Sequence, residues 1–394
     1  MAKSLSKVWL RGFKRLLAIQ TEHAKKTARR AQTRPVRAAS SKPSSNVRPL
    51  KPSAALRAPA KREAPRESRV RPRAAAWASG SWTRSFHSAP AAPGRLVNHL
   101  QYGLYIPSGH THESMPLVVM LHGCTQSIEE FAEGSRMNLL ADRYGFAVVY
   151  PEQSKHAHSH RCWHWYDASD SAGGGEARAV VSLVDALAAQ YGFDRERVYV
   201  AGISAGAGLT ALLAVNYAGH FAAVALHSGP AFGEAHSGIT AMDVMRRGTR
   251  GEPVELVDGM TDVARYPGMP ALIIHGDADH VVAPVNADQL ATQFLRLNRL
   301  VDAHGARQAG EVREDRKGGV VMRDYVRGGR RVVRWCRVQG LGHAWSGGDD
   351  ALPFHSSKGP DASALIWEFF KHQRRPDAGR IVEGADMAAS ALDR

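Results

Sequence analysis

The chain has 394 residues and a formal net charge of +15. It contains no run of about 18 or more apolar residues, which excludes an ordinary transmembrane helix. Its three cysteines are too few for a disulfide-rich scaffold, although they permit one bridge in an oxidising compartment.

The positive charge is concentrated near the N-terminus. Residues 1–97 carry 23 Lys and Arg against 3 Asp and Glu, so residues 98–394 carry 29 against 34. We therefore expect three parts: a basic segment over residues 1–94, a folded domain over residues 95–376 and a C-terminal tail over residues 377–394.

Within the basic segment, residues 1–20 repeat large apolar side chains at helical spacing, with Lys and Arg on another face, which predicts a short amphipathic helix. Residues 21–94 are rich in Ala, Pro, Ser and Arg and predict a disordered linker. The segment either contacts an anionic surface or is a solvated extension, and no specific nucleic-acid site is predicted. It lacks the apolar core and cleavage site of a signal peptide, which favours a cytoplasmic location.

Strands and helices alternate along the rest of the chain. Apolar runs predict strands over residues 98–106, 117–121, 146–150, 197–203, 221–227 and 271–275. Helical patterns cover residues 128–144, 175–191, 207–214, 286–297 and 362–371. Residues 312–339 form blocks in which apolar and polar residues alternate, and pairs of glycines separate the blocks, which predicts antiparallel strands. Together these elements predict one α/β domain with a mostly parallel, doubly wound sheet.

Ser204 lies where a predicted strand turns into a helix. The stretch Gly202-Ile203-Ser204-Ala205-Gly206 has the pattern GxSxG, which exposes a serine hydroxyl on a tight turn. Because a serine hydroxyl is a weak nucleophile at neutral pH, it needs a base that accepts its proton and donors that stabilise an oxyanion. Ser204 is therefore the candidate nucleophile, although this pattern also occurs by chance.

An acid and a base follow in the chain, each on a loop after a strand. Asp279 comes after the strand ending at His275 and is the candidate acid, with Asp277 as the alternative. His343, between glycines after the strand ending near Val338, is the candidate base. The order serine, aspartate, histidine is that of α/β hydrolases.

Two backbone amides are expected to form an oxyanion hole. Ala205 follows the nucleophile at the start of the helix, where the helix dipole adds to the effect. The second amide is expected from the turn after residues 117–121, with Cys124 preferred and Thr125 as the alternative. The same turn could also be a simple connection between a strand and a helix.

Five motifs in order resemble the poly(3-hydroxybutyrate) depolymerase family of esterases, and feruloyl and acetylxylan esterases look similar. The motifs are LHGCTQ (121–126), CWHWYD (162–167), GISAGA (202–207), HGDADHVVAPVNADQL (275–290) and GLGHAWSGG (340–348). The resemblance implies an α/β-hydrolase fold, a catalytic triad of Ser204, Asp279 and His343, and an extracellular location.

Several residues near these motifs keep two interpretations. Cys124 and Cys162 either form a disulfide or remain buried thiols. Trp163 and Trp345, together with Trp165, either line a substrate groove or pack in the core. The histidines at 156, 158, 160 and 164 have no defined ligand geometry, and ester hydrolysis by the predicted residues requires no metal ion or cofactor.

The leading hypothesis is a serine esterase that cleaves short-chain hydroxyacid esters, including polyhydroxyalkanoate, through an acyl-enzyme. The first alternative is a feruloyl or acetylxylan esterase, which would differ in its pocket. The second is a binding module with an inert hydrolase domain, which the complete set of Ser204, Asp279 and His343 disfavours.

Overall fold

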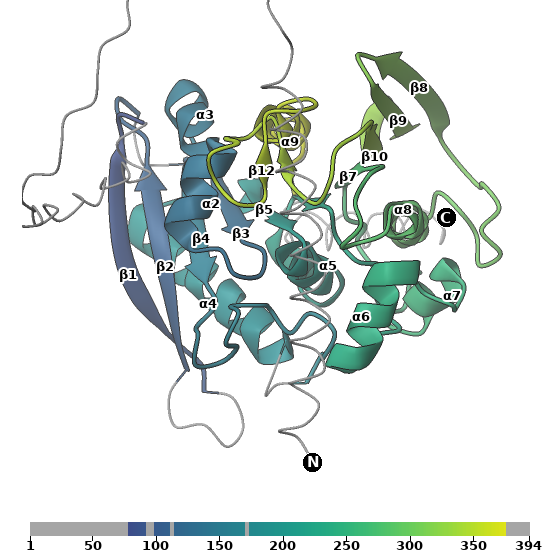
Figure 1. Cartoon of the computed structure of the whole chain (residues 1–394), viewed down its shortest axis with the longest axis horizontal. Helices are drawn as coiled ribbons and strands as arrows, with labels where there is room; N and C mark the ends of the chain where they lie inside the picture. The colour runs from purple at the N-terminus through teal and green to yellow at the C-terminus, as the bar shows by residue number, and fades with distance from the viewer. Residues whose placement is uncertain (1–77, 92–97, 111–113, 170–172, 376–394) are drawn as a thin grey trace, which may run out of the picture.

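The computed structural model describes residues 78–91, 98–110, 114–169 and 173–375, whose arrangement is shown in Figure 1. The predicted N-terminal amphipathic helix, most of the predicted linker and the predicted C-terminal tail lie outside these residues. In the ranges that are described, no helix has both the length and the apolar character needed to cross a bilayer.

The described residues form a ten-stranded sheet in the order β1-β2-β4-β3-β5-β6-β7-β10-β9-β8, and a separate pair, β11-β12. The strands are β1 (Ser81–Ala89), β2 (Asn98–Ile106), β3 (Leu117–Leu121), β4 (Ala147–Glu152), β5 (Val198–Ile203), β6 (Ala223–His227), β7 (Ala271–Gly276), β8 (Glu311–Lys317), β9 (Val320–Arg327), β10 (Arg330–Val338), β11 (Trp345–Ser346) and β12 (His355–Ser356).

The centre of the sheet is parallel and its edges are antiparallel. Neighbours from β4 through β3, β5, β6 and β7 to β10 pair in parallel, whereas β1-β2-β4 and β10-β9-β8 pair in antiparallel fashion. Every residue of β3, β5, β6 and β7 is buried, as expected for strands covered on both faces. The predicted mostly parallel α/β architecture is confirmed.

Helices cover both faces of the sheet (Figure 1). They are α2 (Ile128–Ser135), α3 (Met137–Tyr144), α4 (Gly173–Tyr191), α5 (Ala205–Asn216), α6 (Gly238–Arg247), α7 (Pro253–Asp258), α8 (Val285–Leu297) and α9 (Ala362–Phe370), with short 3-10 turns at η2 (Arg195–Arg197) and η3 (Ala218–His220). Apolar side chains of α4 to α8 share one core and those of α2, α3 and α9 share another. Successive residues of β3 point alternately into the two cores, since Val118 and Met120 belong to the second and Leu117 and Val119 to the first.

The sheet begins earlier in the chain than predicted. Strand β1 pairs with β2 over its whole length, from Ser81 opposite Ile106 to Ala89 opposite Asn98, so the predicted boundary near Arg95 is wrong. The burial pattern of β1 shows one fully buried residue. Backbone pairing with β2 and the packing of Trp82 against Tyr150 hold this strand, although most of its residues are polar and resemble a linker.

The helix predicted over residues 128–144 is two helices. Arg136 lies between α2 and α3 with φ 58°, in the left-handed region. Its amide donates to the carbonyl of Ala132 and so ends α2. Both helices contribute apolar residues to the same core. The apolar residues therefore keep one helical spacing across Arg136, and the sequence pattern does not show where α2 ends.

The predicted antiparallel strands near residues 312–339 are confirmed as β8, β9 and β10. Gly318 and Gly319 connect the first two strands with φ of 58° and 77°, and Gly328 and Gly329 connect the next two with φ of 55° and 73°. Two successive positive φ angles favour glycine and match the twist of a hairpin.

Candidate active site

Ser204 forms the sharp turn between β5 and α5. Its φ is 57° and its ψ is −122°, a strained conformation for a residue other than glycine. Close packing maintains the turn, because a Cβ on Gly206 would lie 2.2 Å from the carbonyl oxygen of Leu121. The Ser204 amide also donates to the carbonyl of His227 on the neighbouring strand β6, at 3.0 Å. The sequence thus folds to hold this hydroxyl at the start of a helix.

Asp279 lies on the loop after β7 and is almost fully buried. Its Oδ1 accepts hydrogen bonds from the amides of Val281 and Val282, both at 2.9 Å. Its Oδ2 accepts from Nδ1 of His343 at 2.7 Å. Burial alone would raise the pKa of the Asp279 carboxyl, but the adjacent His343 ring holds this pKa below its usual range. The carboxylate is therefore stabilised in its ionised form and orients the imidazole.

The structure distinguishes Asp279 from the alternative acid, Asp277. The Oδ1 of Asp277 accepts from the amide of Gly340 at 2.7 Å, and the Asp277 amide donates to the carbonyl of Val338. Asp277 therefore connects the loop after β7 to the loop after β10 and does not contact His343.

His343 and Ser204 line one small hollow, together with Gly123, Cys124, Gln126, Ile203, Val281 and Phe354. The hollow has a volume of about 10 Å³, which is close to the room needed by one water molecule. Because β5, β7 and β10 run in parallel, their following loops meet at one edge of the sheet. The structure therefore brings Ser204, Asp279 and His343 together.

The amides considered for an oxyanion hole differ in what they contact. The Thr125 amide donates to the carbonyl of His160 at 2.6 Å and is already engaged. Cys124 lines the hollow beside Ser204, and the hydrogen bonds among the described residues include none from its amide. Ala205 is the first residue of α5, where amides lack a partner within the helix. This arrangement favours Cys124 over Thr125.

A disulfide joins Cys124 to Cys162 across 38 residues. It fastens the loop that carries Trp163 to the turn beside Ser204, and so settles the choice between a bridge and two thiols. The Trp163 indole nitrogen also donates to the carbonyl of His122 at 3.0 Å. Trp163 lines a second hollow that includes both cysteines of the bridge and Ser204.

Trp345 does not line either hollow, so its position favours core packing over a substrate groove. Its side chain is fully buried, its indole nitrogen donates to Oγ of Ser363, and its ring stacks on His227 at 5.1 Å. The ring of Trp345, on the two-residue strand β11, packs in the second core, a direction that the motif alone did not reveal.

Sequence reasoning missed several residues near Ser204. Tyr166, Met245 and Pro230 line the second hollow; Tyr166 lies within the motif CWHWYD (162–167), which was the available signal, whereas Met245 and Pro230 lie in none of the five motifs. His275 was also missed: its Nε2 donates to the carbonyl of Val282 at 2.9 Å and lies 3.5 Å from Oδ2 of Asp279. Its position directly before Gly276 at the end of β7 was the available signal.

The histidines at 158 and 164 contact nearby protein groups on their own loop and on α4. His164 Nδ1 lies 2.6 Å from Glu176, and His158 Nδ1 accepts from the amides of His160 and Cys162. Among the described residues, no group of three or more His, Cys, Asp or Glu side chains is arranged to hold a metal ion.

Comparisons with known proteins agree on one family. The family model described as Esterase PHB depolymerase matches residues 100–318. Poly(3-hydroxyalkanoate) depolymerase C of Paucimonas lemoignei is 34% identical over 255 residues, covering 64% of this chain and 59% of that protein. Acetylxylan esterase A of Emericella nidulans is 30% identical over 211 residues, covering 50% of this chain and 67% of that protein. These matches confirm the resemblance to depolymerases and acetylxylan esterases.

Among solved structures, an acetyl xylan esterase from Aspergillus awamori has a TM-score of 0.56 and 19% identity, and the match covers 73% of this chain and 99% of that one. The predicted α/β-hydrolase fold is thereby confirmed. The chain spans 59% of the length of the Paucimonas lemoignei protein and 49% of the Ralstonia pickettii poly(3-hydroxybutyrate) depolymerase, to which it is 28% identical over 253 residues, or 59% of this chain.

Proposed function

The chain belongs to the PHB depolymerase family of esterases, and from this premise we propose that it is a serine esterase that cleaves short-chain hydroxyacid esters. The substrates include oligomers or polymer ends of poly(3-hydroxybutyrate). One observation carries the proposal. His343 donates a hydrogen bond to Asp279 at 2.7 Å, and the same histidine lines one hollow with Ser204.

The proposed reaction has two steps. Ser204 Oγ attacks the ester carbonyl while His343 accepts its proton, and the same proton then passes to the leaving alcohol. Water next attacks the acyl-serine with His343 again as base, which releases the carboxylic acid and restores the serine. Asp279 orients the imidazole and stabilises its protonated form, and the amides of Cys124 and Ala205 bind the oxyanion.

The two hollows beside Ser204 are small. Each has a volume of about 10 Å³, close to the room needed by one water molecule, so their size does not select the length of the acyl chain. The second hollow offers apolar contact through Trp163, Trp165 and Met245.

A carbohydrate esterase is the second candidate, because several relatives are named as acetylxylan esterases. Acetate is also a short acyl group, so the size of the hollows does not separate the two substrates. Rates on soluble 3-hydroxybutyrate oligomers, polymer films, acetylated xylan and feruloyl sugars would choose between them.

The decisive experiment for the activity is Ser204→Ala. We expect it to reduce ester turnover by at least about 10³-fold and to abolish labelling by a serine-directed phosphonate. Full ester cleavage by the Ser204→Ala variant would end the serine mechanism. An intact protein that cleaves none of these esters would instead favour a binding module with an inert domain.

For the N-terminal segment, we propose contact with an anionic surface. The 23 Lys and Arg against 3 Asp and Glu in residues 1–97 support it. Adsorption of the full chain to anionic vesicles should weaken as salt rises, and neutral vesicles should bind little. Adsorption independent of salt would contradict this proposal.

A further inference from the structure

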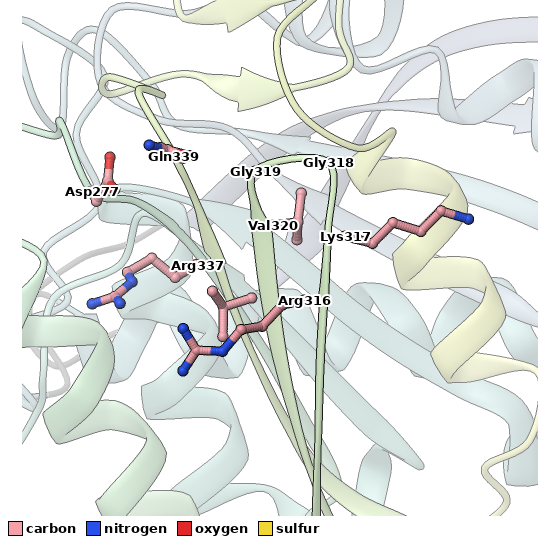
Figure 2. A pocket seen from close by; sticks show the side chains of 9 residues that line it. Asp277, Arg316, Lys317, Gly318, Gly319, Val320, Arg337 and Gln339 are labelled. Atoms are coloured by element: carbon pink, nitrogen blue, oxygen red, sulfur yellow. The ribbon is translucent and has the colours of Figure 1, made fainter.

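A larger cavity lies away from Ser204, beside the tip of the hairpin formed by β8 and β9 (Figure 2). Its volume is about 370 Å³, and it is bordered by Arg316, Lys317, Arg337, Gln339 and Asp277 together with the backbone of the β8–β9 turn. None of these residues lines the two hollows at Ser204. The proposed esterase mechanism makes no use of this cavity.

The segment that forms the cavity is basic, although the surrounding domain is acidic. Residues 311–339 contain nine Lys and Arg against four Asp and Glu, whereas residues 98–394 as a whole contain 29 against 34. A concave site with cationic walls in an otherwise negative domain attracts small anions.

The cationic groups at the cavity keep unused hydrogen-bonding capacity. Arg337 forms no ion pair within the described residues, and its guanidinium lies 5.4 Å from the centre of the Trp335 ring, which fixes its direction. Arg316 contacts one oxygen of Glu314 through Nε at 2.8 Å and Nη2 at 2.6 Å, so its Nη1 remains available. Figure 2 shows both guanidinium groups on the same side of the strands, while Lys317 points away.

Arg316 pairs with Glu314, but the acidic groups near Arg337 form no ion pair with it among the described residues. Asp277 is the one carboxylate that borders the cavity, and its Oδ1 accepts the Gly340 amide. Asp288 on α8 is close enough to Arg337 for electrostatic interaction but forms no ion pair with it among the described residues. The cavity therefore has more donors than acceptors.

We propose that Arg316 and Arg337 bind a small carboxylate anion in this cavity. Two guanidinium groups offer the paired, planar donors that a carboxylate accepts. The choice of a hydroxyacid as the anion rests on the proposed function, because cleavage of a hydroxyacid ester releases a hydroxyacid carboxylate. The proposal that the cavity binds a carboxylate does not depend on that function. A bound anion would lie beside Asp277, which connects the loops that carry Asp279 and His343.

The test measures binding directly by calorimetry, with the full chain carrying Ser204→Ala so that turnover plays no part. Sodium 3-hydroxybutyrate is the probe, and 3-hydroxybutyramide is its neutral counterpart. We expect the acid to bind, with affinity falling as salt rises, and the amide not to bind. The Arg316→Gln variant and the Arg337→Gln variant should each bind 3-hydroxybutyrate about tenfold more weakly, or worse.

Arg313→Gln is the matched control, because Arg313 lies on the same strand, pairs with Glu311 at 2.8 Å and does not border the cavity. Its affinity for the acid should equal that of the parent. Unchanged binding in the Arg316→Gln/Arg337→Gln double variant, or equal binding of acid and amide, would overturn the proposal. Tighter binding of inorganic phosphate than of the acid would overturn the assignment to a carboxylate. Because the proposed function is tested by turnover in the unmodified chain, the two proposals fail separately.

Discussion

Nδ1 of His343 lies 2.7 Å from Oδ2 of Asp279, although 64 residues separate the two in the chain. Parallel pairing of β7 with β10 brings their loops together, and two backbone amides hold the other carboxylate oxygen. The contact fixes the ring so that Nδ1 carries the proton and Nε2 is left free to act as a base.

Replacing this carboxylate tests the role proposed for it. Asp279→Asn should lower kcat/KM by roughly 10⁴-fold, because the amide can favour the wrong tautomer of His343 and no longer stabilises its protonated form. Steady-state hydrolysis of a soluble ester measures the effect.

Asp277→Asn is the matched control, since it changes a carboxylate two residues away that accepts the Gly340 amide and not His343. An amide oxygen can accept the same hydrogen bond, so activity should fall less than about tenfold. Similar losses in the two variants would contradict the assignment of Asp279 as the acid.

Close packing at the turn that holds Ser204 predicts that replacing Gly206 destabilises the fold. A Cβ on Gly206 would lie 2.2 Å from the Leu121 carbonyl oxygen, and backbone atoms cannot move aside cheaply. Gly206→Ala should therefore destabilise the fold by about 3 kcal/mol or more. Urea unfolding followed by circular dichroism gives the change in the free energy of unfolding.

Gly219→Ala serves as the comparison. A Cβ on Gly219 would meet nothing within 4 Å, and its φ lies outside the left-handed region. Its free energy of unfolding should change by less than about 1 kcal/mol. If the two alanine variants were equally stable, close packing at Gly206 would not be what shapes the turn.

The residues at the sheet edge could be predicted because each follows an apolar strand and is flanked by glycine. Ser204, Asp279 and His343 are also in the order that this fold uses. The choice between Asp277 and Asp279 needed the structure to support it, since both lie on one loop and their burial and hydrogen-bond partners cannot be read from the sequence.

Other features depend on contacts between distant segments, which a pattern along the chain does not reveal. Strand β1 is held by pairing with β2, and its large apolar residues, Trp82 and Phe86, are too few to give the alternation that marks a strand. The break at Arg136 needs a positive φ at a residue that rarely adopts one. Trp345 shares its motif with His343, yet the two side chains face the core and the hollow respectively.

The disulfide between Cys124 and Cys162 predicts sensitivity to reductant. Closing a loop of 38 residues contributes about 4 kcal/mol by the chain-entropy relation. Dithiothreitol should therefore lower the melting temperature, and it should lower kcat/KM because Cys124 lines the hollow beside Ser204. Thermal unfolding and ester hydrolysis with and without the reductant measure both effects.

Two serine variants identify the thiols responsible. Cys336→Ser removes the buried free cysteine and should leave the response to dithiothreitol intact. Cys162→Ser should already be destabilised and show no further response. A Cys162→Ser variant that still lost stability on reduction would rule out this bridge as the cause.

Buried histidines predict that the fold weakens in acid. Burial lowers the pKa of His122 to about 4, of His227 to about 3 and of His355 to about 4, from the ordinary value of 6.5. Unfolded chains therefore bind more protons than folded ones between about pH 6.5 and pH 4. The stabilisation is complete above pH 6.5 and is lost as pH falls, by about 1.4 kcal/mol per pH unit for each histidine.

Burial is the main reason that the pKa of His227 is low, and the hydrogen-bond partners of its ring also oppose a second proton. Its Nε2 accepts from the Ser346 amide at 3.2 Å while Nδ1 contacts Oγ of Ser228, so a proton on Nε2 would face another donor. His227→Gln keeps an acceptor near Nε2 and should reduce the pH slope of the free energy of unfolding by about 1.4 kcal/mol per unit. The exposed His156, changed to Gln, should leave the slope unchanged. Equal slopes for both variants, from urea unfolding at pH 5 and pH 6, would show that His227 does not govern the acid response.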